Sequence, residues 1–129
     1  MLKNARPLSA GVFLLALAGC ALQPPNPQEA RILSRPLLCE GEERCNEMWR
    51  RAQTWIANNS RYKLQTVTDV VISTYGPIGT QAYFAYQVTR ERAYGKTDEL
   101  RLKLLCPNLF GCGNRAEETS RFQSYVEQK

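Results

Sequence analysis

Three strand-like stretches joined by two short turn-rich segments constrain the fold of this chain more than any other feature. Residues 62–74 are rich in β-branched side chains, and residues 80–92 and 99–106 alternate between two kinds of side chain, as strands with one buried face do. The joints, residues 75–79 and 94–98, combine glycine with proline or aspartate, which favours turns. Because short connections join antiparallel neighbours, the sequence predicts a three-stranded antiparallel meander.

The alternation also predicts which side chains share a face of this sheet. One face should be apolar and packed under a helix, with Leu64, Val70, Ile72, Phe84, Tyr86, Val88, Leu100, Leu102 and Leu104. The other face should be mixed, with Val67, Val71, Tyr83, Ala85 and Leu105 among Lys63, Gln65, Gln87, Arg101 and Lys103. A mixed face is either covered by the last helix or left partly open as an interaction site. We expect partial cover, and the candidate partner-binding residues are Tyr83, Leu105, Lys63, Arg101 and Lys103.

Helical periodicity flanks the predicted strands on both sides. Residues 42–58 carry an apolar stripe with Trp55 at its edge, formed by Cys45, Met48, Trp49, Ala52 and Ile56. Near the other end, Asn114 and Glu117 have the spacing of a helix cap. The apolar positions after this cap are Ala116, Thr119, Phe122, Tyr125 and Val126. The predicted fold class is therefore α+β in the order α-β-β-β-α.

The first residues of the chain have the layout of an export signal. Lys3 and Arg6 precede the apolar run of residues 11–18, and small residues follow it, as in a secretory signal peptide. The run is about half of the ~20 residues that a bilayer-spanning helix needs. We therefore do not expect it to persist as a membrane span.

The segment Leu17-Ala18-Gly19-Cys20 resembles the lipobox of bacterial lipoproteins. This resemblance covers residues 1–20 and implies that the Cys20 thiol is lipidated, that the chain is cut just before it, and that the new amino terminus is acylated. Several acyl chains on one residue hold a protein firmly to a membrane. Ala21 and Leu22 after the cysteine look like the sorting pattern of outer-membrane lipoproteins of Gram-negative cells. The resemblance thus implies an anchor in the outer membrane and a chain that faces the periplasm.

Three segments follow from this assignment: a signal peptide over residues 1–19, a lipidated proline-rich tether over residues 20–36, and a small α+β domain over residues 37–129. Proline removes backbone donors and favours extended conformations. At ~3.1 Å per residue, the tether is expected to reach at most roughly 50 Å.

Four cysteines remain once Cys20 is assigned to the lipid, namely Cys39, Cys45, Cys106 and Cys112. An even number in an exported chain predicts two disulfides. If the strands run as predicted, all four lie at one end of the sheet, which leaves all three connectivities open. We prefer the local pairs Cys39–Cys45 and Cys106–Cys112, although chain entropy favours the crossed pair Cys45–Cys106. A four-cysteine zinc site is the alternative, but both pairs are spaced Cys-x5-Cys rather than as tight zinc knuckles.

The residue types present argue against catalysis. The chain has no histidine, which removes the usual general base at neutral pH and the commonest transition-metal ligand. The acidic cluster at Glu40, Glu42, Glu43 and Glu47 is explained by a helix start, where carboxylates complement the dipole. Without residues 1–19 the net charge falls from +5 to +3, too little for a nucleic-acid-binding stripe. We therefore expect no enzyme activity, cofactor, metal or nucleic-acid partner.

Two functions fit these constraints. The first is a non-catalytic periplasmic lipoprotein, anchored to the outer membrane, that docks onto an envelope protein as an accessory component. The alternative is a binding module for anionic envelope polymers, such as lipopolysaccharide or peptidoglycan. Its cations would be Lys63, Arg101 and Lys103, or those near the second joint, which are Arg90, Arg92 and Lys96.

Overall fold

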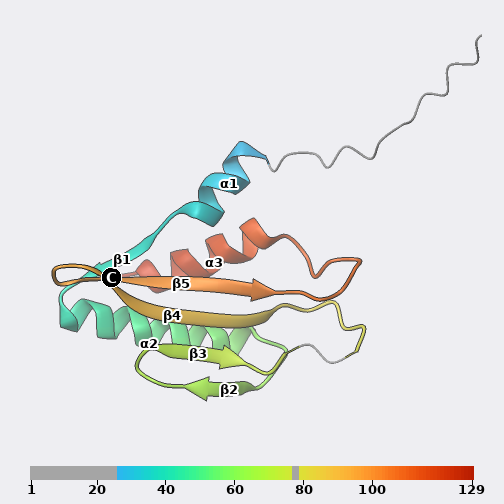
Figure 1. The fold of residues 1–129 in the computed structure, drawn as a ribbon, viewed down its shortest axis with the longest axis horizontal. Helices are drawn as coiled ribbons and strands as arrows, with labels where there is room; N and C mark the ends of the chain where they lie inside the picture. Colours follow the sequence, from blue (N-terminus) through green and yellow to red (C-terminus); the bar gives the residue numbers. More distant parts are fainter. Residues whose placement is uncertain (1–25, 77–78) are drawn as a thin grey trace, which may run out of the picture.

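The computed structural model describes residues 26–76 and 79–129, which form one antiparallel sheet and three helices (Figure 1). In chain order the elements are α1 (Pro27–Ser34), β1 (Leu37–Glu40), α2 (Glu42–Asn59), β2 (Leu64–Val67), β3 (Val71–Thr74), β4 (Ala85–Tyr94), β5 (Thr97–Leu105) and α3 (Arg115–Glu127). The sheet order is β1-β5-β4-β3-β2, and all neighbours are antiparallel. The predicted signal peptide and Cys20 lie outside the described residues.

The predicted three-stranded meander is wrong, first because residues 62–74 form two strands instead of one. A turn at Thr68 separates β2 from β3. The Thr68 N–H donates to the Val71 carbonyl oxygen at 2.8 Å, and Thr68 Oγ1 accepts from the Val71 N–H at 2.9 Å. Threonine and aspartate make such local bonds in turns. Thr68 and Asp69 were therefore the turn signal within a run that is otherwise rich in β-branched residues.

A fifth strand, β1, pairs with β5 and places Leu37 opposite Leu100. Its burial alternates, since Leu37 and Cys39 are buried whereas Leu38 and Glu40 are exposed. Four residues are too few for this period to stand out in the sequence. The sheet therefore has an edge strand that the predicted α-β-β-β-α order lacks.

Helix α1 occupies residues that we expected to form an extended tether. The Asn26 side chain caps it by accepting a hydrogen bond from the Gln28 N–H at 3.0 Å. Pro27 lies in the first turn, where a backbone N–H would have no partner within the helix, so proline costs no hydrogen bond there. The helix contacts α3. Arg35, just after α1, makes an ion pair with Glu127 of α3 at 2.6 Å. Residues 27–34 are therefore helical and packed against α3, not extended as the predicted tether requires.

The β4–β5 hairpin and helix α2 agree with the sequence patterns. In the hairpin Tyr86 lies opposite Leu104 and Val88 opposite Leu102, and Gly95 adopts a φ of 51° at the turn, which favours glycine. All residues of the predicted α2 stripe are buried, and so is Trp55. Trp55 packs edge-on against Tyr86 and Phe122, with ring centroids 5.6 and 5.3 Å apart. It is therefore part of the core rather than at its edge.

Helices α2 and α3 both pack on one face of the sheet. Phe122 and Val126 of α3 belong to the same buried cluster as Ile72, Val88 and Leu100. In Figure 1, α2 runs behind β4, and no described helix is drawn in front of the sheet. The last helix thus does not cover the second sheet face. Of the residues predicted there, Ala85 is buried, Val71 and Gln87 are half-buried, and Leu105 is exposed.

Some side chains lie on the other face from the one predicted. The pairing of β2 with β3 shifts between Leu64 and Thr66, so Val67 lies opposite Ile72 and shares the helix-covered face with it. Val70 is 55% exposed in the turn between the two strands. A shift by one residue exchanges the two faces of a strand, and the bulge produces that exchange here.

None of the described helices combines the length and the apolar composition that a membrane-spanning helix requires.

Candidate interaction site

Two disulfides join the four cysteines in the preferred local pattern. Cys39 bonds to Cys45 with a Cα–Cα distance of 5.1 Å, and Cys106 bonds to Cys112 with a Cα–Cα distance of 5.9 Å. This confirms the expectation of two disulfides and excludes the crossed pair from this structure.

The predicted clustering of all four cysteines at one end of the sheet is wrong. Cys39 lies opposite Asp98 at the start of β5, whereas Cys106 follows the end of β5. The unpredicted strand in residues 62–74 reversed the direction of every later strand. At about 3.4 Å per residue, the length of β5 separates the two pairs, so they cannot share one zinc ion.

A metal site at the first pair would need free thiolates. Cys39, Cys45 and Asp98 bring their ligand atoms within 4.8 Å of one another, but the two sulfurs are bonded together. A thiol must be a thiolate to bind a metal well. The oxidised pair therefore acts as a buried staple between β1 and α2.

The second disulfide closes the tip loop, residues 106–112. Within it the Asn108 side chain accepts from the Phe110 N–H at 2.8 Å, and the Gly111 N–H donates to the Asn108 carbonyl oxygen at 3.1 Å. Gly111 has a φ of 84°, a conformation that L side chains rarely adopt. Asn108 Nδ2 also donates to the Thr80 carbonyl oxygen at 2.8 Å. These bonds hold the loop in one shape.

This shape exposes two large apolar side chains, Leu109 and Phe110, which are both 99% accessible to solvent. We did not predict this exposed pair from the sequence. The available signal was a leucine and a phenylalanine side by side between Asn108 and Gly111. Turn residues on both sides of an apolar pair favour a loop that presents the pair outward.

The end of the sheet that carries the tip loop is free of charge over two stretches of sequence, residues 70–89 and 104–114. They meet there, because Leu105 lies opposite Ala85 and Asn108 bonds to Thr80. The first charged residues on either side of the second stretch are both basic, Lys103 and Arg115. Arg115 is held in place, since it donates to the Leu104 carbonyl oxygen at 2.7 Å.

Most of the predicted partner-binding residues lie toward this end. Tyr83 and Leu105 are 46% and 38% exposed, and Lys63 directly precedes β2, at the end where β3 finishes and β4 begins. The Arg61 guanidinium lies 5.3 Å from the centre of the Tyr83 ring. Tyr83 is therefore a surface residue with a cation beside it.

The uncovered sheet face, here called the outer face, carries the remaining predicted residues. Its exposed or half-buried side chains include Leu38, Val71, Gln87, Arg101, Lys103 and Leu105. Arg101 bonds to Glu99 at 2.9 Å and lies 3.9 Å from Glu91. Its hydrogen bond to Glu99 and the charge of that carboxylate raise the pKa of Arg101. The outer face thus mixes apolar groups with cations that are partly neutralised.

A cleft of about 610 Å³ lies at the other end of the sheet, bordered by α2 and by the β4 side of the hairpin. Two of the predicted cations there share one buried partner: Arg90 Nε lies 2.8 Å from Asp98 Oδ2, and Arg92 Nε lies 2.9 Å from Asp98 Oδ1. Arg90 also donates to Asn46 Oδ1 at 2.8 Å. Asp98 neutralises only one of these two arginines. The residues that line the cleft include one further arginine, Arg50, and three further carboxylates, Glu42, Asp69 and Glu91, so the cleft has no excess of positive charge for an anionic ligand.

No protein-family model, no curated protein and no solved structure matches this chain.

Proposed function

We propose that this protein is a non-catalytic lipoprotein, anchored through Cys20 to the outer membrane and facing the periplasm, that docks onto an envelope protein through its outer face. The anchor rests on the lipobox-like segment Leu17-Ala18-Gly19-Cys20. The absence of histidine from the sequence supports a non-catalytic role. Two buried or half-buried disulfides suit an oxidising compartment such as the periplasm.

One observation carries the docking surface: α2 and α3 pack on the same sheet face, which leaves the opposite face without a helix in the described part of the chain. A face of an antiparallel sheet can simply be solvated. Here Leu38 of β1 and Leu105 of β5 remain 39% and 38% exposed, and Arg101 and Lys103 lie on the same face of β5. Apolar groups with a polar rim are typical of protein interfaces.

The alternative function, binding of anionic envelope polymers, would use the cations. Among the described residues, Arg90 and Arg92 are paired with Asp98, and Arg101 is paired with Glu99. Binding a polyanion at these positions would compete with existing ion pairs. Lys63, Lys96 and Lys103 make no ion pair with a described residue, so polymer binding would rest on these three lysines. The exposed apolar side chains of the outer face favour docking onto a protein instead.

Photo-crosslinking in living cells tests this proposal. A photoreactive amino acid in place of Lys103 should give one discrete protein adduct of defined mass, because this position is exposed on the outer face next to Leu105. The matched control carries the same amino acid in place of Ala57, which is exposed on α2 on the opposite side of the molecule. This control should give no such adduct.

Two results would contradict the proposal. Equal adducts from both positions would mean that the outer face is not distinguished from the rest of the surface. An adduct from position 103 that a muramidase returns to the mass of the protein without an adduct would support polymer binding instead.

A further inference from the structure

Leu109 and Phe110 are more exposed than any other large apolar side chains in the described part of the chain. Single exposed apolar residues are common on protein surfaces. Here two adjacent apolar side chains both have nearly their whole surface in water. Burying them would be favourable by the free energy of transferring two large side chains out of water. This pair therefore has the composition of an insertion element.

The tip loop is built to keep the pair outside the core. The Cys106–Cys112 disulfide closes the loop, Asn108 ties it to Thr80, and Gly111 supplies the left-handed turn. Since these constraints act before any binding event, inserting the two side chains requires little additional ordering.

The surroundings of the pair suit a lipid bilayer. Residues 70–89 and 104–114, which meet at this end, contain no charged group. Charged groups from other segments lie farther from the tip: Arg61 is beside Tyr83, and Glu29 borders the groove next to Leu109. The first charges beyond the tip loop are Lys103 and Arg115. Basic side chains next to an apolar insertion element are favoured at the surface of membranes with anionic lipids.

The tip loop also lies at the end of the molecule from which the chain leads back to Cys20. Glu29 in the first turn of α1 accepts from Asn114 Nδ2 at 3.4 Å, and it borders the same groove as Leu109. From Asn26, the cap of α1, six residue steps lead to Cys20, a span of at most roughly 20 Å. A lipid attached at Cys20 therefore keeps α1 and the tip loop close to the bilayer surface.

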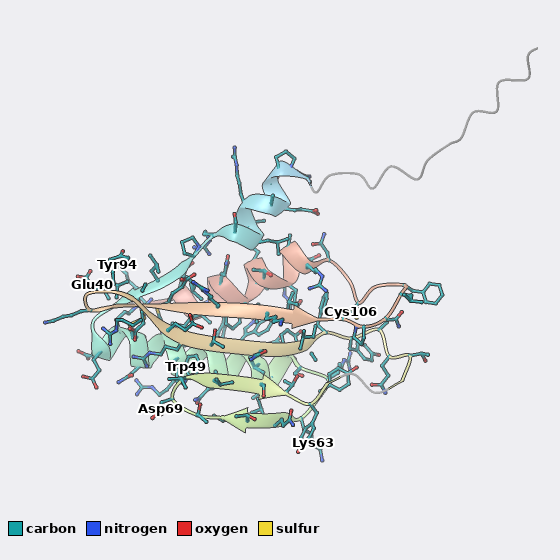
Figure 2. The ribbon with its side chains drawn as sticks, in the orientation of Figure 1. Glu40, Trp49, Lys63, Asp69, Tyr94 and Cys106 are labelled. Carbon is teal, nitrogen blue, oxygen red and sulfur yellow. A yellow bond between two sulfur atoms is a disulfide. The ribbon has the colours of Figure 1, made fainter. Side chains whose placement is uncertain are left out.

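We infer that Leu109 and Phe110 insert into the bilayer that carries the Cys20 anchor, as a second contact between protein and membrane. The inference rests on the lipid anchor of the proposed function. It fixes the orientation of the domain: the tip-loop end faces the membrane, and the opposite end, which Figure 2 marks with Glu40 and Tyr94, points away from it. In this orientation the strands run outward from the membrane surface. The outer face then remains accessible to a protein partner that lies beside the domain.

Tryptophan fluorescence with brominated lipids tests the insertion. The full lipidated protein carrying Phe110→Trp is reconstituted into vesicles of phosphatidylethanolamine and phosphatidylglycerol with bromine on the acyl chains, so that the surface carries anionic lipid for the basic side chains to meet. The native Trp49 and Trp55 are 5% and 4% exposed, so lipid reaches them poorly. The new indole should lose emission and shift to the blue relative to vesicles without bromine.

The matched control is Tyr94→Trp, which replaces an aromatic residue that is 65% exposed at the opposite end of the sheet. Its emission should be the same with and without bromine. Adding Leu109→Ser to Phe110→Trp should reduce the quenching, because burying one large apolar side chain is worth roughly tenfold or more in partitioning.

Each outcome decides between the two proposals. If the mass of the mature protein shows no acyl groups on Cys20, the lipid anchor fails, and the second membrane contact fails with it. If Cys20 is acylated and the Phe110→Trp indole is quenched no more than the Tyr94→Trp indole, only the insertion is overturned. Strong quenching at position 110 alone supports it.

Discussion

At the scale of single residues, Tyr83 and Phe84 show how neighbouring side chains can have opposite roles. Phe84 is 7% exposed and belongs to the core, whereas Tyr83 is 46% exposed with Arg61 beside its ring. The alternation of the sequence predicted that they point to opposite sides, although both residues precede the first residue of β4. Alternation alone could not predict how much of each side chain is buried, because that depends on where α3 packs.

The Tyr83→Asp variant should therefore keep nearly all of its thermal stability. The loss is limited to the contact with Arg61, about 1 kcal/mol or less for an exposed cation–π pair. Differential scanning calorimetry measures this, with Phe84→Asp as the buried neighbour that should unfold the protein. A large drop in melting temperature for Tyr83→Asp would mean that this residue belongs to the core. If Tyr83 contributes to docking, Tyr83→Asp should also weaken crosslinking from position 103.

Tyr86 gives a prediction about alkaline pH. Burial, together with its hydrogen bond to Glu118, raises the pKa of Tyr86, so the folded protein keeps the phenol proton that the unfolded chain releases near pH 10. The stability linked to this proton is complete below about pH 10 and is lost as the pH rises above it. Tyr86→Phe removes the titrating group. In urea denaturation, the wild-type protein should lose up to about 1.4 kcal/mol more per pH unit above pH 10 than Tyr86→Phe, and equal slopes would contradict this account.

At the scale of elements, sequence patterns found the long segments and missed the short ones. Helix α2 and the β4–β5 hairpin repeat their apolar period often enough to be recognised. β1 and the two strands of residues 62–74 have four residues each, which is too few for the two-residue alternation of a strand to be recognised. Helix α1 begins with proline, a residue that suits both a first helical turn and an extended tether. Its packing on α3 decides between them, and no local pattern encodes that contact.

The two disulfides make distinct predictions for tryptic mapping without reduction. Arg44 lies between Cys39 and Cys45, whereas no basic residue lies between Cys106 and Cys112. The first pair should therefore join two tryptic peptides, and the second should stay within the single peptide of residues 104–115. A peptide that joins residues 104–115 to the peptide containing Cys45 would contradict the connectivity in this structure.

At the scale of the whole molecule, one missed turn had the largest consequence. The turn at Thr68 adds a strand, and the added strand moves the Cys39–Cys45 pair and the Cys106–Cys112 pair to opposite ends of the sheet. The tip loop and the start of α1 then share the other end, which gives the domain a membrane-facing end in our account. The sequence indicated an anchored, disulfide-containing α+β protein, but the position of its surfaces depended on the number of strands.

The mass of the mature amino-terminal peptide tests the central claim, the lipid anchor, most directly. The protein is extracted from cell envelopes with detergent and digested, and the peptide that begins the mature chain is measured by mass spectrometry. Our account predicts a chain that starts at Cys20 with acyl groups on both the thiol and the amino terminus, and an unprocessed, unacylated precursor for Cys20→Ser. A mature wild-type chain that starts at another residue, or at a Cys20 without lipid, would contradict it.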